Sequence, residues 1–329
     1  MTIKSKGEMA YIFGGGVPMY IDPIFKGAVM FASLLAMLSL GLTLTFLTTR
    51  VPNFAHGSFA TIGIYVALTV YKVFNVNLYY GLPLAFMLGA LTALALYTFA
   101  LKPLIGRGAS IITLMVATIA FDLVLLAILN IYADYVVNTF KVTSRYFYLR
   151  EADFRLAGHQ GLFYVAPSIV ASLTILLYLV LTRTRFGIAM RATIENPDLA
   201  SAVGINADLV YKVSWLLAGG LAGLAGGLFP LWFIGNPDTG EVVLVSIFAA
   251  SIVGGLYNIY GGLIGGYLIG LAEVLGTSSL ASAFGSWIIP YRPTIPLVVM
   301  VITLLVAPRG ITGLSLQGLK LRRLKHAHS

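Results

Sequence analysis

The chain has 329 residues, of which 59% are hydrophobic and only 10% are charged, and its mean hydropathy is +0.92. A soluble domain cannot hide so much apolar surface, because a single hydrophobic core stops growing at about 250–300 residues. Apolar runs of about 18 residues or more recur, and they do not alternate with polar residues as barrel strands do. The composition therefore predicts an all-α, polytopic helical membrane protein.

The net charge of +9 is better explained by membrane topology than by nucleic-acid binding. There is no cysteine, which excludes disulfides, thiol nucleophiles and cysteine-based zinc sites. The four histidines show no metal-ligand spacing, and the phosphate-binding pattern of P-loop ATPases is absent from the sequence. We expect neither a cofactor nor an ATPase site in this chain.

In chain order, residues 1–24 form a lead-in of mixed charge, residues 25–308 a transmembrane domain, and residues 309–329 a basic tail. A loop of mixed charge is expected over residues 132–161. The seventh and eighth predicted spans are separated by only four residues and should form a tight hairpin. The pattern predicts eight or nine spans, near residues 25–48, 57–71, 79–101, 109–131, 162–181, 210–233, 242–256, 261–278 and 295–307.

Basic residues near the span ends predict the orientation. Arg183, Arg185 and Arg191 flank one polar segment, and further Lys and Arg residues follow the last span. Since cytoplasmic loops are enriched in these residues, we expect both regions, and with them the C-terminus, in the cytoplasm. With nine spans the N-terminus falls outside.

The polar island 187–206 contains the signals of a short helix outside the bilayer. Asn196 is a good N-cap, Pro197 suits the first helical position, and Gly204 can end the helix in a left-handed conformation. Leu199, Ala202 and Val203 fall at helical spacing and form a small apolar stripe. The helix is either a connector resting on the membrane or a docking surface for a soluble partner.

The segment Asn53-Phe54-Ala55-His56-Gly57 lies between the first two spans. Pro52 disfavours helix at the preceding residue, and Gly57 permits a close approach, so the helix should break here. Broken backbone is tolerated at membrane depth only where it lines a cavity or is buried in protein. The alternative is a cytoplasmic turn with a capping Asn53 and a solvated His56.

Two acidic residues fall within predicted spans. Glu273 shares one helix face with a row of glycines at intervals of four residues, so it should point into the helix-packing core, either paired or lining a pathway. Asp122 lies two turns before Asn130 on roughly the same face, and a structural or near-boundary role is favoured for it.

Several of these segments resemble branched-chain amino-acid ABC transporter permeases. The NFAHG segment followed by GSFATIGIYVA is similar to the signature of the family. The segments GGLYNIYGG at 254–262 and APRG at 307–310 resemble two further family blocks. The island resembles the family's cytoplasmic coupling loop, and the resemblance runs from about residue 25 to residue 313. Asp122 departs from the family, which usually has a small or polar residue there.

The resemblance implies the membrane subunit of an ATP-driven importer in the cell membrane. Its partners would be cytoplasmic ATP-binding subunits, a second permease subunit in a heterodimer, and an extracytoplasmic solute-binding protein. It implies that the loop 184–206 carries a coupling helix and contacts the ATPase through Arg191, Glu195, Asn196, Pro197, Leu199, Ala202, Val203 and Gly204. Asn53, Phe54, His56, Gly57, Glu273 and Asp122 are the candidates for the pathway.

Two alternatives remain open at this stage. A stand-alone secondary carrier or channel would use Glu273 or Asp122 as an ion site and would not require the island. A related permease for urea or short amides would share the same motifs.

Overall fold

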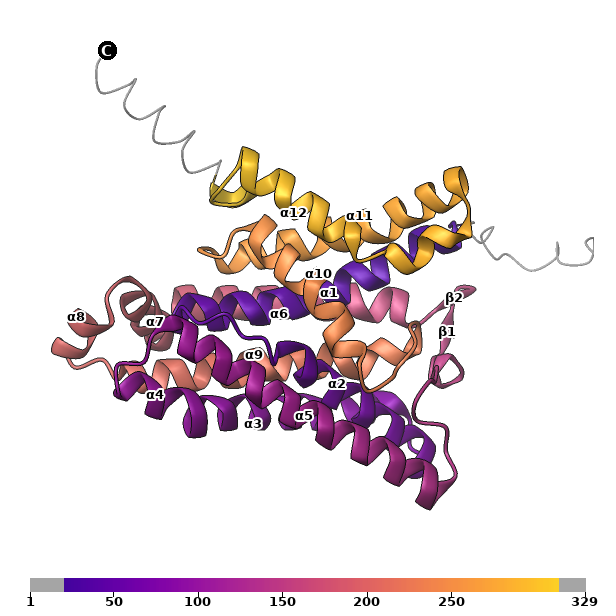
Figure 1. Ribbon diagram of the computed structural model, residues 1–329, viewed down its shortest axis with the longest axis horizontal. Helices are drawn as coiled ribbons and strands as arrows, with labels where there is room; N and C mark the ends of the chain where they lie inside the picture. Colours follow the sequence, from indigo (N-terminus) through magenta and orange to yellow (C-terminus); the bar gives the residue numbers. More distant parts are fainter. Residues whose placement is uncertain (1–20, 314–329) are drawn as a thin grey trace, which may run out of the picture.

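The computed structural model describes residues 21–313, and this part of the chain is almost entirely helical (Figure 1). The first twenty residues of the predicted lead-in and residues 314–329 of the predicted basic tail lie outside the described part. The elements are α1 (Pro23–Thr49), α2 (His56–Leu68), α3 (Leu82–Ala95), α4 (Lys102–Gly106), α5 (Ile111–Phe140), β1 (Arg155–Leu156), β2 (His159–Gln160), α6 (Leu162–Arg183), α7 (Arg185–Glu195), α8 (Pro197–Ala202), α9 (Ala207–Leu228), α10 (Thr239–Gly254), α11 (Ile259–Phe284) and α12 (Thr294–Val306).

Short turns of other helix types extend several of these elements. A π-helical turn, Thr69–Val73, continues α2, and another, Leu96–Leu101, joins α3 to α4. The remaining turns are 3-10 helices at Leu78–Gly81, Arg150–Ala152, Phe229–Leu231 and Ser286–Tyr291.

The prediction of a polytopic helical membrane protein is confirmed. Within the described residues, seven helices are long and apolar enough to cross a membrane, and α10 is a shorter apolar helix. Each of the nine predicted spans is helical. The clearest difference is α5, which continues to Phe140 instead of ending near Ile131, because Ala133 and Val136 stay buried against the rest of the fold.

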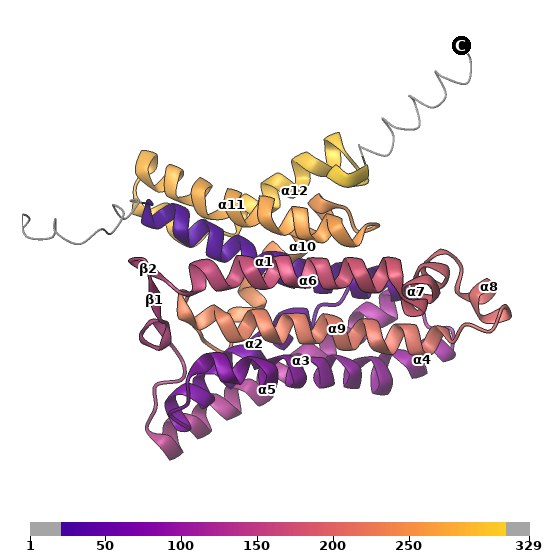
Figure 2. The ribbon, with the colours of Figure 1, turned by 180° about the vertical axis from the view of Figure 1, so that it is seen from behind.

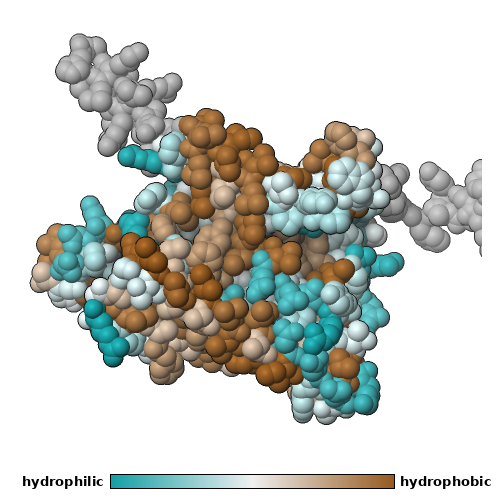
Figure 3. All heavy atoms as spheres, in the orientation of Figure 1, coloured by the Kyte–Doolittle hydropathy of each residue, from teal (hydrophilic) through white to brown (hydrophobic). Residues whose placement is uncertain are grey.

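The molecule has two distinct ends, which the helices connect in alternating directions (Figures 1 and 2). We call them the hairpin end, which carries β1 and β2, and the α8 end, which carries α7 and α8. The helices α1 and α9 are buried along most of their length, whereas most side chains of α5, α6 and α12 are at least partly exposed. Figure 3 shows apolar surface in the middle of the visible face, with hydrophilic patches toward both ends, as expected of a protein in a bilayer.

Glycine rows allow the central helices to pack closely. A Cβ at Gly266 or Gly270 of α11 would lie only 2.3–2.4 Å from backbone atoms of Ala36 or Ala32 in α1. In α9, a Cβ at Gly223 would lie 2.2 Å from the Ala85 carbonyl oxygen of α3. Close backbone packing drives helix association in lipid, where hydrophobicity gives little drive.

These contacts reveal an inverted internal repeat. The helices α1, α2 and α3 of the first half correspond to α9, α10 and α11 of the second half. When the halves are exchanged, the extensive contact of α1 with α11 becomes the equally close contact of α9 with α3. The helix α1 runs from the hairpin end to the α8 end, and α9 runs the opposite way (Figure 1). The sequence carries a trace of the repeat, since Asn53 stands four residues before Gly57 as Asn236 stands four residues before Gly240.

The first turns of α2 and α10 touch at the centre of this repeat. A Cβ on Gly57 would lie 2.3 Å from the Gly240 carbonyl oxygen, and a Cβ on Gly240 would lie 2.2 Å from the Gly57 carbonyl oxygen. The Gly240 amide also donates to the Thr61 hydroxyl at 3.0 Å. This Gly57–Gly240 crossing leaves no room for a side chain at either of the two positions.

We predict that Gly57→Ala disrupts folding, because the added methyl group would overlap backbone atoms that cannot move aside. Overpacking costs about 1–3 kcal/mol where side chains can shift, and more is expected here. The measurement is the yield of monodisperse protein after detergent extraction and its thermal unfolding midpoint. Gly106→Ala is the matched control, because no atom lies within 4 Å of its added Cβ; equal yields for the two variants would contradict the packing described.

Candidate functional site

The chain breaks after α1 and returns into the body of the molecule. Arg50, in the left-handed conformation with φ 57°, ends α1 at the α8 end. Residues 51–55 are not helical, and the His56 Nε2 then lies 2.9 Å from the Leu38 carbonyl oxygen, midway along α1. The helix α2 therefore begins at mid-depth. The predicted break is confirmed.

The broken segment is buried and receives support from α5. The Asn53 side chain accepts from the Ala55 amide at 3.1 Å, and the Phe54 amide donates to the Thr118 hydroxyl of α5 at 3.3 Å. One helical turn further along α5, Asp122 accepts from the Ser58 hydroxyl at 2.5 Å. Asp122 therefore anchors the start of α2 to α5.

Burial rules out the solvated turn. His56 and Asn53 are fully buried, so the alternative with a solvated His56 is wrong. Phe54 packs against Phe248 of α10, with 5.1 Å between ring centroids. The sequence left the two alternatives open because the break is a local signal, whereas the burial comes from the fold-back along α1.

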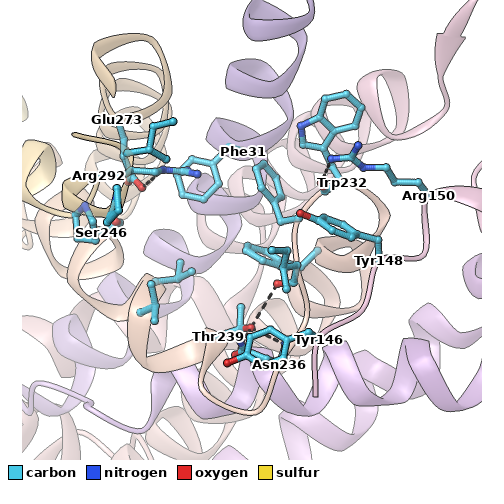
Figure 4. A pocket seen from close by; sticks show the side chains of 18 residues that line it. Phe31, Tyr146, Tyr148, Arg150, Trp232, Asn236, Thr239, Ser246, Glu273 and Arg292 are labelled. Atoms are coloured by element: carbon cyan, nitrogen blue, oxygen red, sulfur yellow. Dashed lines mark hydrogen bonds and ion pairs between the residues drawn. The ribbon is translucent and has the colours of Figure 1, made fainter. Parts of the chain in front are cut away.

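A cavity of about 560 Å³ lies between the Gly57–Gly240 crossing and the hairpin end (Figure 4). Thr239, beside the crossing, lines one side of it. Phe31 of α1 and Trp232, in the segment before α10, line its aromatic walls. Arg150 stacks on Trp232, 4.6 Å from the ring centroid. We call this cavity the central pocket.

Glu273 lines the central pocket and forms an ion pair there. Its Oε1 accepts from the Nε of Arg292 at 2.7 Å, and its side chain is only 5% exposed. The prediction that Glu273 faces the packing core is confirmed, and a partner is present. Sequence analysis missed Arg292, because it precedes α12 in a segment placed outside the spans.

The island forms two helices, α7 and α8. Sequence analysis missed α7. This helix begins at Arg185 and is capped by Thr184, whose hydroxyl accepts from the Gly187 amide at 3.2 Å. The predicted signals of α8 are confirmed: the Asn196 side chain accepts from two amides of the first turn, and Gly204 has φ 87°.

Apolar side chains are exposed on α8 and at its C-cap. Leu199 is 63% exposed, Val203 is 71% exposed, and Ala202 is exposed beside them, while Ala200 faces the protein interior. Arg191 and Glu195 on α7 are also exposed. We call Leu199, Ala202 and Val203 the α8 stripe; the described part of the chain leaves it uncovered.

We predict that Arg292→Gln destabilises the protein, because it leaves the Glu273 charge buried without a partner. Breaking such a pair costs about 3–5 kcal/mol, and the partial exposure of Arg292 favours the lower end. The double variant Glu273→Gln/Arg292→Gln removes both charges and should unfold close to the wild-type temperature. The measurement is thermal unfolding in detergent; a double variant that is less stable than Arg292→Gln would contradict this account.

Comparison with known proteins agrees with this geometry. The family model described as "Branched-chain amino acid transport system / permease component" matches residues 24–307. The chain is 49% identical over 297 residues to the probable branched-chain amino acid transport permease protein LivH of Methanocaldococcus jannaschii, covering 90% of this chain and 94% of that protein. It is 25% identical over 306 residues to LivH of Escherichia coli and 26% identical over 309 residues to BraD of Pseudomonas aeruginosa; each comparison covers 89% of this chain and 96% of the relative.

A match of this extent, together with nine predicted spans that are all helical, identifies the class of protein. The chain belongs to the branched-chain amino-acid ABC transporter permease family and is a membrane permease subunit of an ABC importer.

Proposed function

We propose that the chain carries branched-chain amino acids across the cell membrane by alternating access, driven by separate ATP-binding subunits. The relatives' names support this substrate class. The sequence has no P-loop, so the chain would have no ATPase site of its own. A solute-binding protein would deliver substrate at the hairpin end, and a second, different permease subunit would complete the pathway.

The observation that carries this proposal is the α8 stripe. Leu199 and Val203 expose apolar side chains at one end of the molecule, as a docking helix for a soluble partner requires. Beneath the stripe, α7 is seated firmly: Met190 is buried, and a Cβ on Gly187 would lie 2.3 Å from the Leu181 carbonyl oxygen of α6. The helix α7 also packs on α1 and α9. A push on α8 would therefore reach the central helices.

Charge supports a cytoplasmic location for the α8 end. At the hairpin end, Lys72 pairs with Glu151 and Arg145 pairs with Asp134, so acidic partners offset the basic residues. At the α8 end, Lys102 and Lys212 share Asp208, but the arginines form no ion pair within residues 21–313; they include Arg50, Arg107, Arg183, Arg185 and Arg191. By the positive-inside rule the coupling loop 184–206 and the C-terminus would be cytoplasmic, and the N-terminus outside.

We predict that Leu199→Asp separates the ATPase from the permease. The change places an unpaired charge in an apolar contact, which costs several kcal/mol when the charge is buried. Asn196→Ala should be milder, because losing an N-cap costs about 1 kcal/mol. The measurements are co-purification of the ATP-binding subunit and substrate-stimulated ATP hydrolysis in proteoliposomes.

Ser201→Asp is the matched control for this experiment. Ser201 is an exposed polar residue of the same helix, outside the α8 stripe, and should tolerate the added charge. All three variants should insert and fold normally, because none touches a span. Full ATPase retention in Leu199→Asp would mean that α8 is only a surface connector.

The orientation gives a separate prediction. The absence of native cysteine permits single-cysteine labelling with an impermeant reagent in intact cells. Ala157→Cys, at the tip between β1 and β2, should be labelled from outside, and Ser201→Cys should be labelled only after the membrane is opened. Labelling of Ser201→Cys in intact cells would reverse the proposed topology.

A further inference from the structure

We propose that the central pocket is a transit site for an aliphatic α-amino acid zwitterion, with Glu273 holding the ammonium group and Arg292 holding the carboxylate. This inference rests on the proposed function for the substrate class, but its geometry comes from the pocket alone. It assigns the transported molecule a binding site within the permease.

The first step in the argument is the unused bonding capacity of the ion pair. Glu273 and Arg292 share one contact, Nε to Oε1. The Oε2 of Glu273 and the Nη2 of Arg292 are both buried and have no hydrogen-bond partner among the described residues. Ser246 of α10 faces the same carboxylate, and all three side chains lie on one side of the pocket (Figure 4).

A purely structural ion pair would look different. Buried charges are normally compensated by hydrogen bonds to all their polar atoms, because each unsatisfied atom forfeits its solvation. In this pair the Nη2 of Arg292 has no acceptor among the described residues, and the only neighbour of the Glu273 carboxylate there besides Arg292 is the Ser246 hydroxyl of α10; both groups border the cavity. An amino acid offers the complementary groups, an ammonium donor and a carboxylate acceptor, on adjacent atoms. Binding would give both groups a partner without adding net charge to the pocket.

The walls match an aliphatic side chain. Apart from its charged groups, the pocket is lined mainly by aromatic and aliphatic residues, among them Phe31, Phe233, Val242 and Val243. Phe31 also stacks on the Arg292 guanidinium, 4.2 Å from the ring centroid, which holds the guanidinium in place. Its volume, about 560 Å³, falls within the range of about 300–1,000 Å³ usual for small-molecule sites.

The position suits a pathway. Thr239 lines the pocket and lies next to Gly240, so one wall of the site is the crossing of α2 and α10. A molecule bound at Glu273 would lie on the hairpin-end side of this crossing. Movement of α10 relative to α2 would change the shape of the pocket. The same movement would change the crossing of the two helices, which forms the barrier beneath the pocket.

The test is protection from chemical labelling. Val242 lines the pocket and is 58% exposed, so Val242→Cys gives a reporter in a chain that has no native cysteine. The complete transporter in nanodiscs is treated with a charged thiol reagent in the presence of one of three compounds. These are leucine and two amines that lack its carboxylate, leucinamide and 3-methylbutylamine. We expect leucine to slow labelling several-fold and the two amines to protect much less.

The double variant Glu273→Gln/Arg292→Gln, which we call the neutral pair, distinguishes loss of substrate recognition from loss of folding. In Val242→Cys combined with Glu273→Gln/Arg292→Gln, the protein should stay folded and leucine protection should disappear. Ser201→Cys on α8 controls for effects of leucine on the reagent. Protection that survives the neutral pair, or equal protection by leucine and leucinamide, would overturn the assignment.

Leucine uptake by the reconstituted wild-type transporter distinguishes a failure of the proposed transit site from a failure of the proposed importer function. Uptake without protection would overturn the transit site and leave the importer proposal standing. Absence of uptake by the wild-type transporter would instead contradict the proposed function. Both measurements use the same preparation.

Discussion

The contact between Gly57 and Gly240 is the constraint on which the rest of the architecture depends. It brings together the first turns of two helices, whose unpaired amides and dipoles carry partial charge of the same sign. Such ends can lie close together only if their amides find acceptors. Thr61 supplies one for Gly240, and the asparagine side chains serve the segments before each helix, Asn53 for Ala55 and Asn236 for Asp238. The inverted repeat thus meets at a polar centre where Asn53, Gly57 and Gly240 are buried, while Asn236 borders the central pocket.

The helix α1 connects this centre to the α8 end and to the central pocket. It packs on α11 through closely spaced small residues, contacts α7 at the α8 end and contributes Phe31 to the central pocket. Tight helix packing transmits displacement because it is only slightly compressible. A movement that starts at α8 therefore has a continuous route of packed backbone to the pocket.

The sequence predicted the features that local signals specify. Pro52 and Gly57 indicated the chain break, Asn196 and Gly204 indicated α8, and glycine spacing indicated the face of Glu273. It could not predict how deep the break lies, because depth depends on packing against α1. It missed Arg292 and α7 for a related reason: each lies in a segment between predicted spans, whose place is set by tertiary contacts rather than by hydrophobic pattern.

The crossing of α2 and α10 also has a consequence for sequence divergence. The residues at most tight contacts in a core can change during evolution, because a larger residue on one side can be compensated by a smaller residue on the other. At Gly57 and Gly240 each missing side chain faces the backbone of the other helix, and backbone cannot be made smaller. No second mutation can compensate for a change at either position. We therefore expect these two glycines to stay fixed among relatives that share this fold, even where the residues that line the central pocket change.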